Sequence, residues 1–272
     1  DDILELSCNG SRALIPDTAT IILRWTEERQ KLLDGLSEEY EVNRIEDTIR
    51  ITAKGVASHT ANPRAGKNAL LLLTKVLCQT KVLKESDRDL FELLHVINSD
   101  YSGKALDIDC EDEMSGPATV TAANAYIKDG RLAIQFFSRL PVSSNEIPFR
   151  EKAAAAAERW GFQLEVIKLS KSNYFDPKHP AVSVLTDTYN KVMGLETKPF
   201  VMSGGTYASK LPRAFAFGTG GLPIQRRPEG LFLPGHGDYH QPDEAIVMER
   251  IEKAILVYIY SILELDKLEK IV

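Results

Sequence analysis

Cysteine is scarce in this 272-residue sequence, and its number is odd. The three residues, Cys8, Cys78 and Cys110, are widely spaced and stand in apolar or mixed surroundings. A disulfide framework would use an even set, so we expect free thiols in a reducing compartment. The sequence also does not open with the basic segment and apolar core of a secretory signal. Together these absences predict a cytoplasmic protein.

Long apolar runs and basic clusters are missing as well. No stretch approaches the roughly 20 apolar residues that a membrane-spanning helix needs. The 33 basic residues are outnumbered by 39 acidic residues, for a net charge of -6, and no Lys and Arg cluster with interleaved aromatic residues occurs. These absences argue against a membrane protein and against nucleic-acid binding, and favour small or cationic partners.

What is present is enough apolar sequence, 43% of residues, to fill one large or two ordinary domains. Hydrophobic periodicity predicts an alternation of strands and helices. We expect strands at 3–8, 18–25, 48–53, 118–127, 132–138, 162–169, 198–202 and 214–218. We expect helices at 26–40, 68–79, 87–97, 147–160, 181–193 and 245–265.

Turn signals organise these elements. Asp129-Gly130 between two alternating runs predicts a hairpin. The acidic stretch 100–117 could be mistaken for a calcium loop, but it lacks the central Gly and closing Glu, so we expect a solvated loop. Residues 173–180 carry two prolines and no periodicity, which predicts a domain boundary.

Two stretches carry candidate chemistry. The glycine pair of Ser203-Gly204-Gly205-Thr206-Tyr207-Ala208 precedes a predicted short helix, where backbone N–H groups can approach a ligand. About thirty residues later, His236-Gly-Asp-Tyr-His240-Gln-Pro-Asp-Glu sets histidines among acids, a pattern that suits a metal ligand. Each stretch alone also fits a plain role, as a tight turn or a solvated loop.

With Gly55-Val56-Ala57-Ser58-His59, continuing to Pro63, Gly66 and Asn68, and with Ser138-Arg139-Leu140-Pro141, these stretches resemble the M20 family of metallopeptidases, nearest to PepV-like dipeptidases. The likeness runs in order from about Leu6 to Leu265. It implies an α/β and α+β protein in three parts. Residues 1–16 would end the first part of a catalytic domain, 17–172 would form a ferredoxin-like lid with an inserted helical segment, and 173–272 would form the C-terminal part of the zinc-peptidase α/β domain.

The resemblance also implies roles for single residues. His240 would bind one zinc ion, His59 would stabilise the oxyanion of the reaction, and Arg139 would bind the substrate carboxylate or oxyanion. The backbone N–H groups of Gly204, Gly205 and Thr206 would bind substrate. Read alone, His59 also fits a surface histidine, and Arg139 an ordinary ion-pair partner.

Two departures from the family stand out. Ala13 occupies the place of a substrate-binding Asn, and Ser209 follows Gly-Gly-Thr-Tyr-Ala where the family commonly has Arg. The family's remaining metal ligands and its catalytic Glu have no counterpart in this sequence. We therefore expect two zinc ions in a complete protein and little or none bound by this chain alone.

The resulting hypothesis is a zinc-dependent dipeptidase, present as a fragment that needs an N-terminal catalytic half. Its substrate would be a small dipeptide, its lid would close about hinges at 12–17 and 173–180, and it could form a homo-oligomer. The alternative is a non-catalytic binding or oligomerisation module derived from that family. A serine hydrolase built on Ser203 or Ser209 is disfavoured, because no Gly-x-Ser-x-Gly sequence surrounds either residue.

Overall fold

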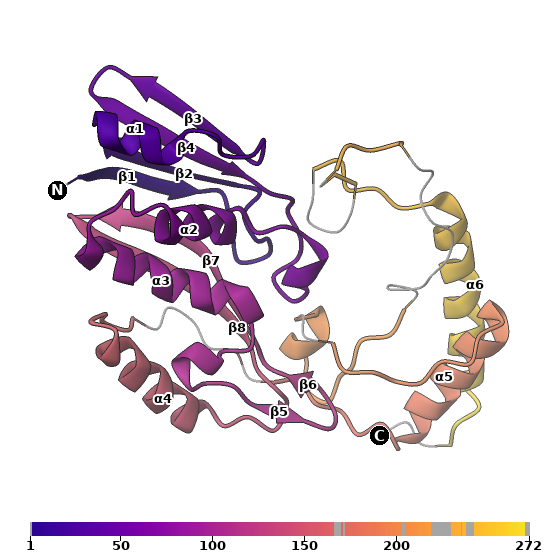
Figure 1. Ribbon diagram of the computed structural model, residues 1–272. Helices are drawn as coiled ribbons and strands as arrows, with labels where there is room; N and C mark the ends of the chain where they lie inside the picture. Colours follow the sequence, from indigo (N-terminus) through magenta and orange to yellow (C-terminus); the bar gives the residue numbers. More distant parts are fainter. Residues whose placement is uncertain are drawn as a thin grey trace.

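A four-stranded antiparallel sheet opens the structure. The computed structural model describes residues 2–165, 170, 172–202, 205–218, 230–234, 236–237 and 242–269. The sheet has the order β1-β2-β4-β3 (Figure 1). Its strands are β1 (Ile3–Cys8), β2 (Thr18–Arg24), β3 (Tyr40–Ile45) and β4 (Thr48–Lys54).

The alternation of buried and more exposed residues along its strands defines the inner face of this sheet. Ala19, Ile21 and Leu23 of β2 are fully buried and pair across the ladder with three equally buried residues of β4. Because successive strand residues face opposite sides, these apolar pairs all lie on one face. The sheet therefore offers a continuous apolar surface to the helices that pack on it.

Helix α2 (Ala69–Gln79) covers that face, and α3 (Glu85–Asp100) packs against α2. Helix α1 (Glu27–Leu33) follows β2 in the chain. The Asn68 side chain caps α2 by accepting from the N–H of Leu70 at 2.9 Å. Leu70, Leu73 and Leu77 of α2 are fully buried, and they share the core with Phe91 and Leu94 of α3.

A long hairpin, β7 (Thr119–Lys128) and β8 (Arg131–Arg139), packs beside β1. Its turn has positive φ at Asp129 and Gly130, as a two-residue hairpin turn requires. The buried Asn98 amide of α3 exchanges two hydrogen bonds with the backbone of Ala122, at 3.0 and 3.1 Å. This exchange fixes the hairpin against the helical layer.

Smaller elements and one further helix complete this region. A two-residue pair, β5 (Glu111–Asp112) and β6 (Gly116–Pro117), crosses the acidic loop, and α4 (Glu146–Arg159) follows the hairpin. Short 3-10 turns lie at Pro63–Ala65 and Lys104–Leu106. The antiparallel sheets and mixed helices confirm the α+β class, whereas the ferredoxin-like arrangement of the lid stays a prediction.

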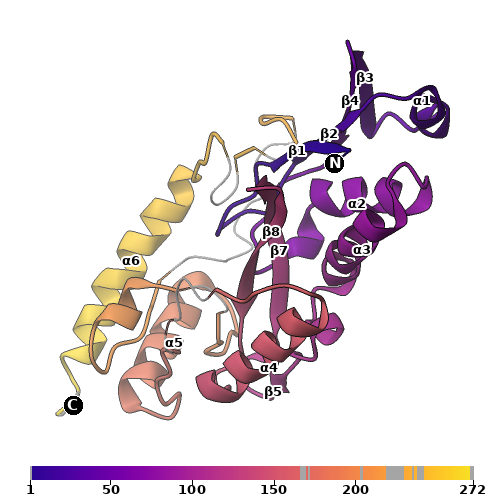
Figure 2. The same cartoon turned by 90° about the vertical axis from the view of Figure 1, so that its left-hand side faces the viewer.

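The C-terminal part is built differently. Helices α5 (Pro180–Met193) and α6 (Met248–Leu265) lie side by side, away from the four-stranded sheet, in both Figure 1 and Figure 2. Between them the described residues form only one regular element, the 3-10 turn η3 (Tyr207–Lys210). None of the described helices is long and apolar enough to cross a membrane.

Several sequence predictions are wrong in this structure. The helix predicted over 26–40 ends at Leu33, and Gly35 takes a positive φ of 81° before β3, which the sequence analysis missed. Residues 162–165 are not a strand, and 166–169 lie outside the described residues. The stretches 198–202 and 214–218 are also not strands. A strand needs a neighbour to receive its hydrogen bonds, and among the described residues no strand pairs with either stretch.

The three thiols lie in the first region and are free, as predicted. Burial raises the pKa of the Cys8 thiol and, together with the charge of Glu92, raises the pKa of Cys78 to about 11. A thiol with a raised pKa is a poor nucleophile at neutral pH. These two cysteines therefore pack rather than react.

Candidate functional site

Two loops meet just beyond the ends of β1 and β4, and we call residues 9–16 and 55–67 the loop pair. The Ile15 N–H donates to the carbonyl of Ser58 at 2.9 Å, and the Thr60 N–H donates to the carbonyl of Ala13 at 2.8 Å. Leu14 and His59 form the antiparallel bridge between these bonds. The loop pair is thus a short ladder that fixes the two loops to each other.

Glycines allow the close approaches around this ladder. A Cβ on Gly10 would lie 1.7 Å from the carbonyl oxygen of Ala123, and one on Gly55 would lie 2.0 Å from that of Lys67. Only glycine fits such contacts. The glycine and asparagine positions that suggested a family resemblance here are therefore explained by packing and capping, whereas His59 is not.

His59 is half-buried within the ladder. Its Nδ1 accepts a hydrogen bond from the N–H of Ala61 at 3.1 Å. In the neutral ring the proton then resides on Nε2, which makes that nitrogen a donor. A donor of this kind suits an anion or a developing oxyanion.

Arg139, the last residue of β8, reaches the loop pair from the hairpin. Its Nη2 donates to the hydroxyl Oγ1 of Thr60 at 3.3 Å, and the same hydroxyl donates to the carbonyl of Arg12 at 2.8 Å. Thr60 is completely buried, and its carbonyl accepts from the hydroxyl of Thr121 at 3.3 Å. The structure therefore brings Arg139 to the residue that follows His59.

The two charged side chains at this junction, Arg139 and Arg12, are both positive. Burial lowers the pKa of the Arg139 guanidinium, and the nearby charge of Arg12 lowers it further. The buried Nε of Arg139 has no hydrogen-bond partner among the described residues. Arg12 was missed by sequence reasoning, because only the pairing of the two loops places it beside Arg139.

The glycine turn differs from what the sequence predicted. Gly205 and Thr206 lead into η3, a four-residue 3-10 turn, so they do not open an α-helix with an N-terminal dipole. A Cβ on Gly205 would meet no atom within 4 Å, so close packing does not demand glycine there. No hydrogen bond recorded between described residues joins Gly205 or Thr206 to His59 or Arg139. Ser203 and Gly204 lie outside the described residues.

The histidine stretch is described only in part. His240, the predicted zinc ligand, lies outside the described residues together with 238, 239 and 241. His236 Nδ1 lies 2.8 Å from a carboxylate oxygen of Asp243. Within the described ranges no group of three or more His, Cys, Asp or Glu side chains could hold a metal ion. The described residues therefore do not by themselves fit a zinc site.

The contacts of Ser209 do not support the serine-hydrolase alternative. Its hydroxyl donates to the carbonyl of Thr206 at 2.8 Å, and its N–H donates to the same oxygen at 3.2 Å. A nucleophilic serine instead bonds to a base such as histidine. Ser209 closes a local turn.

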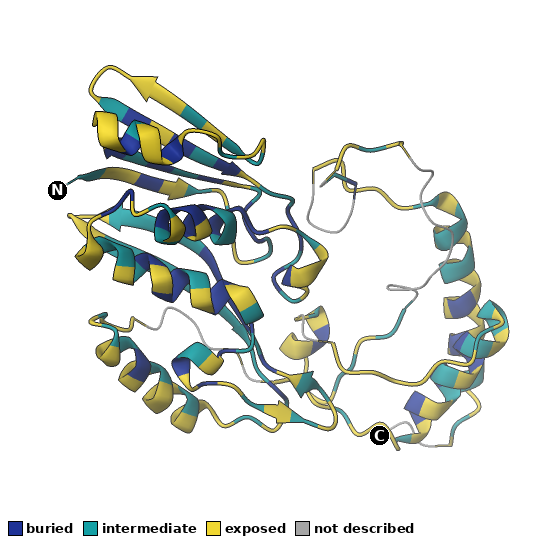
Figure 3. Ribbon diagram, in the orientation of Figure 1, coloured by how far each residue is buried: buried dark blue, intermediate teal, exposed yellow. Residues whose placement is uncertain are grey.

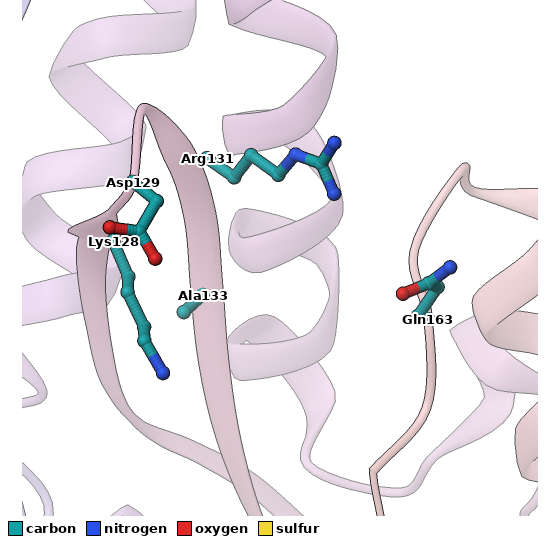
Figure 4. Close-up of a pocket in the computed structure, with 5 residues that line it drawn as sticks. All are labelled: Lys128, Asp129, Arg131, Ala133 and Gln163. Carbon is teal, nitrogen blue, oxygen red and sulfur yellow. The ribbon is translucent and has the colours of Figure 1, made fainter.

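An open depression of about 450 Å³ lies elsewhere, at the turn of the hairpin (Figure 4). It is lined by Lys128, Asp129, Arg131, Ala133 and Gln163. Arg131 and Arg139 stand at opposite ends of the nine-residue strand β8, which spans about 26 Å at roughly 3.3 Å per residue. This depression is therefore separate from the loop pair, and its lining holds none of the residues to which the sequence analysis gives a catalytic, substrate-binding or metal-binding role.

Comparison with known proteins shows similarity to proteins named as putative dipeptidases. No family model matches the sequence. The chain is 32% identical to "Putative dipeptidase YtjP" of Bacillus subtilis over 93% of its own length and 53% of that protein. It is 24% identical to a "Putative dipeptidase" of Staphylococcus epidermidis over 96% of its length and 55% of that protein. The chain thus spans about half the length of the curated relatives it matches, and nearly all of it is similar to them.

Proposed function

We propose that this chain is part of a dipeptidase, a hydrolase that cleaves the single peptide bond of a dipeptide. The observation that carries the proposal is the similarity to proteins named as dipeptidases along 93% of the chain. The loop pair supports it, because Arg139 donates to the hydroxyl of Thr60, the residue next to His59, and both side chains are of a kind that can bind an anion.

The finer proposal is a zinc-dependent M20-type enzyme. Residues 17–172 would form the lid, and 1–16 and 173–272 would belong to the catalytic domain. His240 would bind one of two zinc ions. The described residues supply no ligand cluster, so the other ligands and the catalytic Glu would come from a part of the complete protein that is not in this chain.

The residues of this chain would act on the charge of the substrate. The Nε2–H of His59 and the guanidinium of Arg139 donate to a carboxylate or to the oxyanion that forms as the peptide carbonyl is attacked. Thr60 holds the Arg139 side chain in place. Backbone N–H groups at Gly204, Gly205 and Thr206 would bind the substrate from the C-terminal part.

The test compares this 272-residue chain with the polypeptide of the complete gene that contains it. Both are assayed for hydrolysis of a dipeptide panel and for bound metal by elemental analysis. We expect about two zinc ions and hydrolysis in the longer protein, and neither in this chain. A longer protein that contains zinc but hydrolyses no dipeptide contradicts the proposed activity, and hydrolysis without metal contradicts zinc dependence.

The second candidate is a non-catalytic module that binds a partner or another copy through a sheet edge. One observation favours it: β3 is an edge strand with a neighbour on one side only, and most of its residues are exposed. Sedimentation analysis of the 272-residue chain would show a dimer that a proline substitution at Asn43 dissolves. A monomer at high concentration contradicts this candidate.

A further inference from the structure

The hydroxyl of Thr60 links the backbone of Arg12 to the side chain of Arg139. It donates to the carbonyl of Arg12 and accepts from Nη2 of Arg139. Since Thr60 is fully buried and both of its backbone groups are also hydrogen-bonded, this junction is fixed. Arg12 therefore starts from a fixed backbone position beside Arg139, and its exposed side chain is the part that can adjust.

No carboxylate offsets this pair within the described part of the chain. The ion pairs recorded there include neither Arg12 nor Arg139. Asp17, the acid nearest to Arg12 in the sequence, accepts instead from the side chains of Asn9 at 2.6 Å and Thr18 at 3.0 Å. Two guanidinium groups without an acid repel each other, and an anion would relieve the repulsion.

The geometry limits what this anion is. One guanidinium binds one carboxylate through two parallel hydrogen bonds, and Arg139 also has a buried Nε without a recorded partner. A ligand with a single carboxylate would satisfy Arg139 and leave Arg12 unpaired. A ligand with two carboxylates would satisfy both residues.

We propose that Arg12 is a specificity-determining residue: with Arg139 it forms a paired-guanidinium site that favours dipeptides bearing a second carboxylate, from an Asp or Glu side chain. The identity of the ligand as a dipeptide rests on the proposed function. The pairing of Arg12 with Arg139 does not depend on the proposed function.

The hydrolytic test uses the complete protein with glycyl-glutamate and glycyl-glutamine, which differ by one charge. In Arg12→Gln we expect kcat/KM for glycyl-glutamate to fall about 10-fold, the size of one charge-assisted hydrogen bond, and that for glycyl-glutamine to change less than about 2-fold. Arg12→Lys should keep part of the preference. The matched control is Arg64→Gln, an exposed arginine of the same loop pair that binds the carbonyl of Asp100.

A binding experiment separates this inference from the proposed function. Calorimetry on the 272-residue chain measures affinity for the same two dipeptides, and we expect tighter binding of glycyl-glutamate that Arg12→Gln abolishes. Equal binding of the two, or binding of neither, overturns the inference, as does an unchanged preference in the Arg12→Gln enzyme. Charge-selective binding by the chain together with an inert complete protein would overturn the proposed function alone.

Discussion

The two parts of this chain differ in how extensive a core their described residues form. In the first, strands β2 and β4 and helices α2 and α3 share one continuous core of buried residues. In the second, the buried hydrophobic cluster between α5 and α6 has two members among the described residues, Tyr189 and Val257, with partly buried side chains around them. Figure 3 shows the contrast, with the buried residues gathered in the sheet and its helices.

Helix α6 illustrates this difference in burial. Val257 and Ser261 are buried on one side, whereas Ile255, Ile259 and Ile262 form an exposed stripe at helical spacing on another. The helix forms regardless, because a helix satisfies its own backbone hydrogen bonds. The stretches 198–202 and 214–218 do not become strands, because a strand depends on neighbours. Among the described residues, the first part therefore buries its apolar faces within itself, whereas α6 leaves an apolar stripe exposed.

The strongest test of this difference between the two parts uses two substitutions that shorten a side chain to alanine. Leu73→Ala removes a fully buried side chain from α2 and should lower the free energy of unfolding by about 3 kcal/mol, through lost burial and the cavity left behind. Ile262→Ala removes a side chain of α6 that is 67% exposed and should change it by less than about 0.5 kcal/mol.

Urea titration followed by circular dichroism measures both variants. Equal losses would mean that α6 is packed as tightly as α2, and the distinction between the two parts would fail.

A smaller effect is expected at the junction of the loop pair. Thr60→Val keeps the shape but removes the hydroxyl that contacts Arg12 and Arg139, so we expect a loss of about 1 to 2 kcal/mol, since the hydrogen bonds to both residues are lost inside a part-buried junction. Dipeptide affinity should fall as well, because Arg139 is no longer held.

Thr52→Val is the matched control for this variant. It removes a hydroxyl that bonds Thr20 at 3.0 Å across the sheet and takes no part in the hydrogen bonds of the Thr60 junction. Its stability should change by a comparable or smaller amount, with dipeptide affinity unaltered. A parallel loss of affinity in Thr52→Val would contradict a specific role for Thr60.

The smallest expected effect is a pH dependence within the first part. Hydrogen bonds from Lys84 and then Arg29 lower the pKa of Asp2 to about 2. A carboxylate with a lowered pKa stabilises the fold above its unfolded pKa, roughly 3.9, and this stability is lost as pH falls toward 2. Asp2→Asn should therefore cost less than about 1 kcal/mol at pH 7, and the difference from the parent should vanish near pH 2 in acid-unfolding curves.

Sequence reasoning succeeded where a local signal decides the structure. The Asp129-Gly130 turn fixes the hairpin, and the apolar periodicity of α2 and α5 fixes two helices within a residue or two of their ends. It missed β3, an edge strand whose mostly exposed residues lack the apolar alternation of β2.

The candidate site could be predicted only in pieces. His59 and Arg139 were both identified, but their junction at Thr60 joins residues 79 positions apart. No spacing rule encodes such a contact, because it depends on the meeting of two loops and the end of a hairpin. Arg12 carried no motif and became a candidate only once that junction was known.

The most direct test of the account is the substitution Arg139→Gln in the complete protein, assayed for dipeptide hydrolysis. If the loop pair binds the charge that develops on the substrate, kcat/KM should fall roughly 100-fold, while the melting temperature stays close to that of the parent. An enzyme that keeps its full kcat/KM without Arg139 would contradict the assignment of this loop pair to the active site.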